Sequence, residues 1–136
     1  MKRRYVIDAS FIAAYFAGIE ETRRYIHDIM DGRAEGYMCE VNVAEFLYNH
    51  ARVFGWDAAL TRHALLRASP IVFVGLDEEL VIEAAKLKVK YYRILSLADC
   101  FLVASAKLHK ADVLTCDPAI QDVEEVRAVY IKYRQP

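Results

Sequence analysis

Glycine and proline are scarce in this sequence, with 5 and 3 copies among 136 residues. Together with a hydrophobic content of 56%, this scarcity excludes a collagen-like or disordered chain and leaves no stretch that could act as a flexible linker. A chain of this length is long enough to bury one core. We therefore expect one domain that spans residues 1–136.

Cysteine and net charge are also low. The three cysteines lack CxxC spacing, so neither a disulfide framework nor a zinc ribbon is expected, and reduced thiols in the cytoplasm are. A net charge of −1 gives no overall attraction to nucleic acid, so an RNA must be held by a local basic patch or by metal ions. Asp8 interrupts the first apolar run, and residues 9–18 are too few to span a bilayer. We expect a cytoplasmic protein that does not enter the membrane.

Strand-like and helical segments alternate along the chain. Short β-branched or aromatic runs predict strands at residues 5–7, 36–39, 71–74, 113–115 and 127–131. Apolar residues at helical spacing predict helices at residues 11–16, 20–30, 42–54, 57–68, 77–93 and 97–110. This alternation indicates an α/β fold, with a parallel sheet covered on both faces. The run at 71–74 is apolar throughout, which is typical of a fully buried strand.

Four acidic residues stand where a strand or loop gives way to a predicted helix. Sites in parallel sheets form beyond the carboxyl ends of the strands, and two of these acids follow strands directly. Carboxylates gathered there repel one another by roughly 4 kcal/mol per pair at 4 Å and an effective dielectric near 20, a cost that a bound cation removes. Oxygen ligands without His or Cys favour Mg²⁺ (or Mn²⁺) over zinc. The four acids are Asp8, Glu45, Asp99 and Asp117.

Helix capping offers a different explanation for all four acids, and its sequence signals are clearest for three of them. Asn42 and Glu45 have the spacing of a capping box, and so do Ser96 and Asp99. Asp117 precedes a proline, which is favoured at the first helical position. In this interpretation the three acids only stabilise helix ends, and both explanations stay open.

Asp8 is harder to explain as a structural residue. It closes a hydrophobic strand and is expensive to bury unless it binds something. The hydroxyl of Ser10, two positions on, is predicted to cap the helix that begins at Phe11. The histidines share no ligand spacing and are expected at helix surfaces or ends; they are His27, His50, His63 and His109.

The motifs around the acids, taken in order, resemble the PIN-domain family, and within it the small VapC-like ribonuclease toxins. The resemblance covers nearly the whole chain. It rests on residues 5–10 (YVIDAS), 43–45 (VAE), 97–106 (LADCFLVASA) and 114–117 (LTCD). Two positions depart from the family pattern: Asn42 stands where Ser or Thr is frequent, and Asp117 is followed by Pro118 rather than by a second nearby acid.

The resemblance implies a three-layer α/β/α sandwich around a parallel sheet of four to five strands, and metal-dependent endonuclease activity on RNA. It implies Mg²⁺ (or Mn²⁺) as cofactor, and a small antitoxin as protein partner. The apolar helices between residues 42 and 68 are large enough to contact that partner or to form a homodimer. The implied catalytic and metal-binding residues are Asp8, Glu45, Asp99 and Asp117, with Ser10, Thr115 and Asn42 in supporting roles.

Two other functions compete with a ribonuclease. A haloacid-dehalogenase-like phosphotransferase would use Asp8 as a nucleophile, but it needs a second Asp two residues later, where this chain has Ser10. A non-enzymatic PIN-like module would bind RNA or a protein and keep the acids only as caps. The complete set of four acids favours the enzyme.

Overall fold

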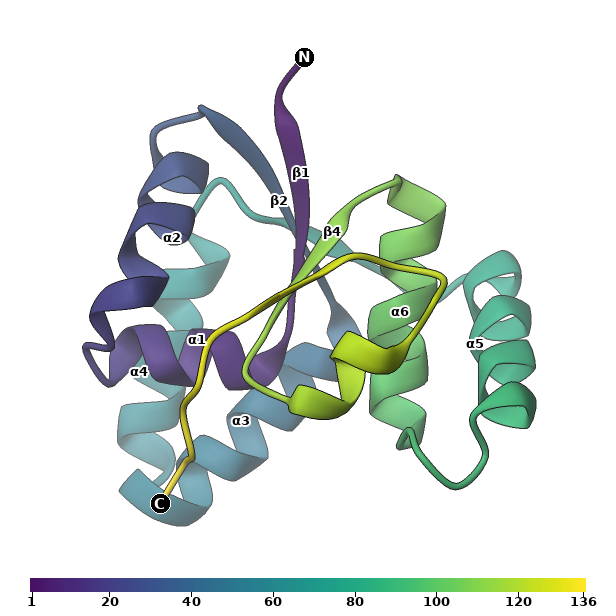
Figure 1. Cartoon of the computed structure of the whole chain (residues 1–136). Coiled ribbons are helices and arrows are strands. Elements are labelled where there is room, and N and C mark those ends of the chain that lie inside the picture. Colours follow the sequence, from purple (N-terminus) through teal and green to yellow (C-terminus); the bar gives the residue numbers. More distant parts are fainter.

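The five strands form one parallel sheet in the order β3-β2-β1-β4-β5. A computed structural model describes all residues from 1 to 136, and β1, β2 and β4 lie at its centre (Figure 1). The strands are β1 (Arg3–Ile7), β2 (Ala34–Cys39), β3 (Val72–Val74), β4 (Asp112–Thr115) and β5 (Ala128–Tyr130). The predicted parallel sheet is confirmed.

Helices cover both faces of the sheet, and α1 and α2 lie on the opposite side from α5 and α6 (Figure 1). Side chains of β1 alternate between two cores: Ile7 packs with α1 and α2, whereas Val6 packs with α5 and α6. The predicted α/β/α sandwich is therefore confirmed. The helices are α1 (Ala9–Phe16), α2 (Arg23–Met30), α3 (Glu40–Phe54), α4 (Trp56–Arg67), α5 (Glu78–Lys90) and α6 (Leu97–His109), with short 3-10 turns η1 (Glu20–Thr22) and η2 (Pro118–Asp122).

Local sequence signals set several helix ends. Gly55, at φ 89°, separates α3 from α4 in a conformation that an L side chain rarely adopts. The Asp77 carboxylate caps α5 by accepting a hydrogen bond from the Leu80 amide. Helix α6 is buried without interruption from Cys100 to Ala106, as its apolar sequence predicts. None of the helices has the length and apolar character needed to span a bilayer.

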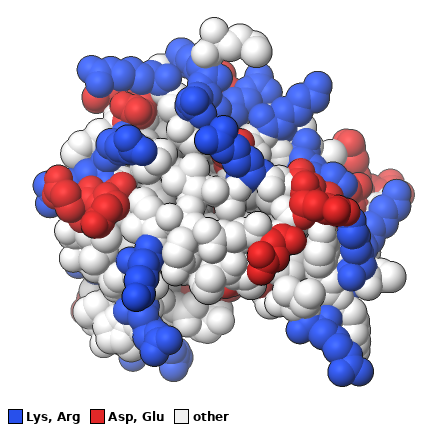
Figure 2. Space-filling view, viewed as in Figure 1, with Lys and Arg blue, Asp and Glu red and all other residues white.

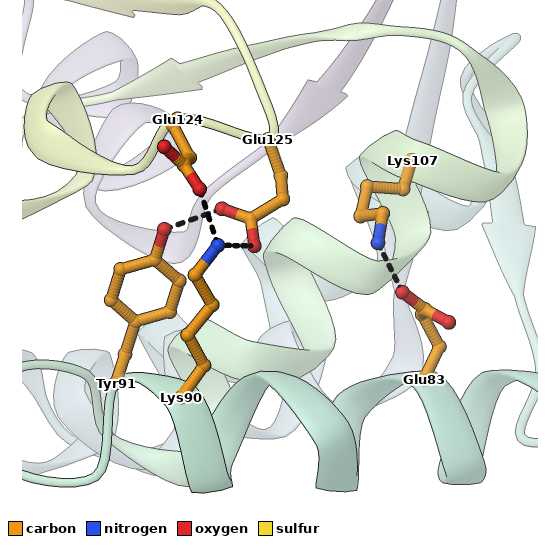
Figure 3. A network of polar contacts seen from close by, with 6 residues as sticks. All are labelled: Glu83, Lys90, Tyr91, Lys107, Glu124 and Glu125. Carbon is orange, nitrogen blue, oxygen red and sulfur yellow. Dashed lines mark hydrogen bonds and ion pairs between the residues drawn. The ribbon is translucent and has the colours of Figure 1, made fainter.

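A polar network joins the end of α5 to the segment before β5 (Figure 3). The ammonium of Lys90 pairs with both Glu124 and Glu125, and it lies 2.9 Å from Oε2 of Glu125. The Tyr91 hydroxyl donates to the other oxygen of Glu125. A separate pair, Lys107 with Glu83, links α6 to α5. These contacts join α5 to the segment before β5 and to α6.

Two local predictions are wrong. The run at 71–74 is not a fully buried central strand, because β3 is an edge strand and Val72 is 52% exposed. His50 is not a surface residue: its ring is buried and stacks on Phe46. The apolar sequence of β3 does not indicate which strands lie next to it, and only the strand order decides which strand lies at an edge.

Candidate metal centre

A cleft of about 120 Å³ opens at the carboxyl edge of the sheet. All four acids predicted from the sequence line it, although they come from four different parts of the chain. Asp8 follows β1, Glu45 lies on α3, Asp99 lies in the first turn of α6, and Asp117 follows β4. The other lining residues are Ala9, Ser10, Ala13, Phe46, Asn49 and Gln135.

Asp8 is the deepest of the four acids, at 4% exposure. Its backbone amide donates to the carbonyl of Leu114 at 2.9 Å, which continues the pairing of β1 with β4. Its Oδ2 accepts hydrogen bonds from Thr115 Oγ1 at 2.7 Å and from Ser10 Oγ at 3.0 Å. No protein group donates to Oδ1, so this oxygen is available to a ligand in the cleft.

Backbone amides fix the direction of both hydroxyls. Ser10 Oγ accepts from the amide of Cys116 at 3.0 Å, and Thr115 Oγ1 accepts from the amide of Asp117 at 2.9 Å. Since each hydroxyl has one proton, that proton is directed to Asp8. The bonds from these predicted supporting hydroxyls favour the charged form of Asp8 and fix the position of its Oδ2. The prediction that Ser10 caps α1 is wrong, because the helix already begins at Ala9 and Ser10 lies inside it.

Asp99 and Asp117 cap helices and also face the cleft. The Ser96 and Asp99 side chains form the predicted capping box, with Asp99 Oδ2 accepting from the Ser96 amide at 3.1 Å. Asp117 Oδ1 accepts from the Ala119 amide at 2.9 Å, ahead of Pro118. In both residues the capping bond uses one carboxylate oxygen. Capping and a place in the cleft are therefore compatible.

Glu45 and Asn42 do not form a capping box, because α3 begins two residues before Asn42. Asn42 is fully buried, and its Nδ2 donates to the carbonyl of Ala98 at 3.2 Å. This bond ties α3 to the first turn of α6, next to Asp99. Asn42 Oδ1 has no partner. The side chain of Glu45 is left to face the cleft rather than a helix end.

Burial makes these carboxylates costly to ionise. It raises the pKa of Asp8 to about 6, and the charges of Asp99 and Asp117 act in the same direction, while the bonds from Thr115 and Ser10 oppose it. Burial also raises the pKa of Glu45 to about 7, with added repulsion from Asp8 and Asp99. The pKa of Asp99 is raised by burial as well. The pKa values of Asp8, Glu45 and Asp99 therefore depend on the charges of the neighbouring acids.

No lysine or arginine forms an ion pair with these acids; the charge of Lys88 lowers the pKa of Asp99, but burial outweighs it. All eight ion pairs of the chain lie elsewhere, so the four acids have no cationic partner. No three His, Cys, Asp or Glu side chains are spaced to hold one ion together. Mg²⁺ fits such a site, because it is usually bound through one or two carboxylates and keeps several waters. Asp8 Oδ1 and Asp99 are the groups that would hold it, with Glu45 and Asp117 acting directly or through water.

The sequence did not predict two polar residues that line the cleft, Asn49 and Gln135. Asn49 lies four residues after Glu45 and so shares its helix face, a signal that could have been found. Gln135 lies beyond the last strand, and no motif connects it to the acids. Asp122 is exposed and is not part of the lining.

The PIN-domain family model matches residues 5–126, which includes every acid of the cleft. The chain belongs to the PIN-domain family. No curated protein sequence matches it. The family model confirms the resemblance that the sequence motifs indicated.

Solved structures show the same fold at low sequence identity. VapBC2 from Rickettsia felis, bound to a promoter DNA fragment, matches with a TM-score of 0.77 at 8% identity, covering 93% of this chain and 98% of that one. DNA-bound VapBC from Salmonella typhimurium gives 0.75 at 12% identity, covering 96% and 98%. VapC20 from Mycobacterium tuberculosis, described as a sarcin-ricin loop cleaving toxin, gives 0.68 at 16% identity, covering 90% and 98%. This PIN domain therefore has a VapC-like fold.

Proposed function

We propose that this chain is a metal-dependent endoribonuclease and the toxin of a type II toxin–antitoxin pair. The observation that carries the proposal is the convergence of four carboxylates without a cationic partner on one cleft of a PIN domain. The likeness in fold to VapC20, which is described as a sarcin-ricin loop cleaving toxin, supports RNA as the substrate class. A divalent cation would offset the negative charge of the cleft and would let an RNA phosphate approach the carboxylates.

The residues of the chain prepare the site in two ways. Thr115 and Ser10 hold one oxygen of Asp8 and leave the other directed to the cleft. Burial raises the pKa of Glu45 to about 7, so near neutral pH this carboxyl is protonated in about half of the molecules and would lose that proton on binding a cation. When bound, the cation supplies the Lewis acidity that activates water and offsets negative charge in the transition state. Cleavage by this route does not need the 2′-hydroxyl and leaves a 5′-phosphate.

The competing functions receive less support. A haloacid-dehalogenase-like phosphotransferase also needs a lysine from a later motif, and no lysine lines the cleft. Ser10 bonds to Asp8 at the position where such an enzyme would need its second acid. A binding module that uses the acids only as caps does not account for Glu45, which caps nothing, or for the buried Asp8. The enzyme accounts for all four.

We further propose a small antitoxin as partner, a homodimer and a cytoplasmic location. An arginine of the antitoxin would neutralise the acids of the cleft. Large apolar side chains that are exposed on α3 and α4 would supply contact area for the antitoxin or the second copy; they are Tyr48, Phe54, Trp56, Leu60 and Leu65. The likeness in fold to a toxin–antitoxin complex from Klebsiella pneumoniae, with a TM-score of 0.68 at 16% identity, supports the partner class.

Cleavage of end-labelled single-stranded RNA tests the enzyme directly. We expect cleavage by the purified chain with Mg²⁺ or Mn²⁺, none in EDTA, and products with 5′-phosphate and 3′-hydroxyl ends. A contaminating ribonuclease that uses the 2′-hydroxyl would leave 2′,3′-cyclic phosphates, so the product ends identify the activity. Cleavage that persists in EDTA, or that Asp8→Asn and Asp99→Asn both leave undiminished, would falsify the proposal.

A further inference from the structure

The cleft has an acidic half and an uncharged half. On α3, Glu45 belongs to the acidic half, and Asn49 lies one turn further along the same face. Gln135 joins Asn49 in the lining, and Ala13 of α1 keeps the space open because its side chain is small. The cleft therefore extends from the acids toward two side-chain amides.

Residues 131–136 carry Gln135 to the cleft. This segment follows β5 and crosses in front of α1 toward α3 (Figure 1). Its side chains alternate: Ile131 and Tyr133 pack against the core beside α1, whereas Lys132 and Arg134 are exposed. Gln135 is the next residue on the inward side. Two core contacts thus hold the segment in the register that places an amide beside the acids.

Both amides lack a partner within the chain. No hydrogen bond of the structure involves the side chain of Asn49 or Gln135, and both residues are half-buried. An amide carries two donors and one acceptor, which match the polar edge of an unpaired base. It also adds no charge, so it can lie beside the carboxylates without repelling them.

The outer side of the same segment is positive. Lys132 and Arg134 are exposed and take part in no ion pair. Figure 2 shows Lys and Arg side chains along the path that this segment follows in Figure 1. A polyanion that enters a cleft lined by four acids needs such charges close by.

We propose that Asn49 and Gln135 form the subsite for the nucleotide next to the scissile phosphate of a single-stranded RNA. The two amides bind the base edge, and Arg134 binds a neighbouring phosphate on the outer side of the segment. This inference rests on the proposed ribonuclease function and adds to it the residues that read the substrate. Asn49 and Gln135 are thus specificity residues, separate from the acids that hold the cation.

Equilibrium binding in EDTA tests the subsite apart from cleavage. Fluorescence anisotropy with labelled oligo(A) and oligo(U) is measured for the wild type, Asn49→Ala, Gln135→Ala and Gln135→Glu. We expect affinity to fall about 3- to 10-fold in the alanine variants, the range of one or two hydrogen bonds. Gln135→Glu, which loses a donor and adds a repelling charge, falls further. The ratio of the two affinities moves toward one in every variant.

Gln121 supplies the matched control, because it is exposed on η2 and outside the cleft. Gln121→Ala and Gln121→Glu should leave RNA affinity within 2-fold of the wild type. The rise in melting temperature that Mn²⁺ produces should be the same in Asn49→Ala, Gln135→Ala and the wild type.

RNA affinity that is the same in the wild type and both alanine variants overturns the subsite, as does a wild type that binds no RNA. A chain that binds RNA through these amides but does not cut it keeps the subsite and loses the nuclease. A chain that cuts RNA with an unchanged half-saturating concentration in both variants keeps only the nuclease.

Discussion

Two groups of carboxylates in this molecule have opposite surroundings. At the carboxyl edge of the sheet, four acids line one cleft without a cation. Beside α5, Glu124 and Glu125 share the ammonium of Lys90, and Tyr91 donates to Glu125 (Figure 3). Burial raises the pKa of Asp8 to about 6, whereas the hydrogen bonds from Tyr91 and Lys90 outweigh burial and lower the pKa of Glu125.

The difference separates acids that stabilise the fold from acids that need a ligand. Glu124 and Glu125, the α5 group, are paired with the ammonium of Lys90, so their charges are satisfied when the chain folds. The cleft group is held in place by hydroxyls and backbone amides, which position the carboxylates but cannot cancel their charge. A site that costs stability and has no cation of its own is typical of function.

The largest expected difference between the groups is in RNA cleavage. Asp8→Asn and Asp99→Asn should each lower the cleavage rate about 100-fold or more, because each removes a negative charge that would hold the cation at the reacting phosphate. Glu125→Gln should stay within 2-fold of the wild type. Single-turnover assays in saturating Mg²⁺ measure all three variants. Equal losses in Glu125→Gln and Asp8→Asn would remove the distinction between the groups.

A second difference is expected in the pH dependence of stability without metal. The folded pKa of Asp8, about 6, lies above the ordinary value of 3.8 for an aspartate. Its contribution is therefore fully present below about pH 4 and is lost as the pH rises through 6, by up to about 3 kcal/mol. Asn keeps an acceptor for Thr115 and Ser10, so Asp8→Asn should be more stable than the wild type at pH 7.5 in EDTA. Urea unfolding at several pH values measures this, and a wild type that gains stability over the variant between pH 5 and 7.5 contradicts it.

The smallest effect is expected in the α5 group. Lys90→Met removes the cation from two exposed or partly exposed glutamates, and surface ion pairs contribute little because water screens them. The urea midpoint should fall slightly, less than the change that Asp8→Asn produces at pH 7.5, and RNA cleavage should not change. A large loss of cleavage in Lys90→Met would mean that this group acts on the cleft.

The sequence predicted the fold well where local signals are strong and poorly where neighbours decide. The capping box at Ser96 and the stop at Gly55 are local, and both are confirmed. The edge position of β3 depends on strand order, and the burial of His50 depends on which helices cover α3. Neither is contained in the pattern of a single segment.

The site followed a similar division. The four acids could be predicted because they belong to ordered motifs at the ends of strands and helices, and the fold brings them to one cleft. The capping role given to Asn42 was wrong because the helix begins at Glu40, earlier than its apolar spacing indicates. Gln135 could not be predicted, since its place depends on how residues 131–136 pack across the molecule.

Titration of the metal-free chain with Mn²⁺ by calorimetry tests the central claim, that the cleft acids are a divalent-metal site. We predict binding at micromolar to millimolar Mn²⁺ in the wild type at pH 6.5. The heat should differ between two buffers of unlike ionisation enthalpy, because Asp8 and Glu45 release protons as the ion binds. Asp8→Asn should abolish the binding and Glu125→Gln should keep it. Binding that is absent in the wild type, or equal in the wild type and Asp8→Asn, would contradict the account.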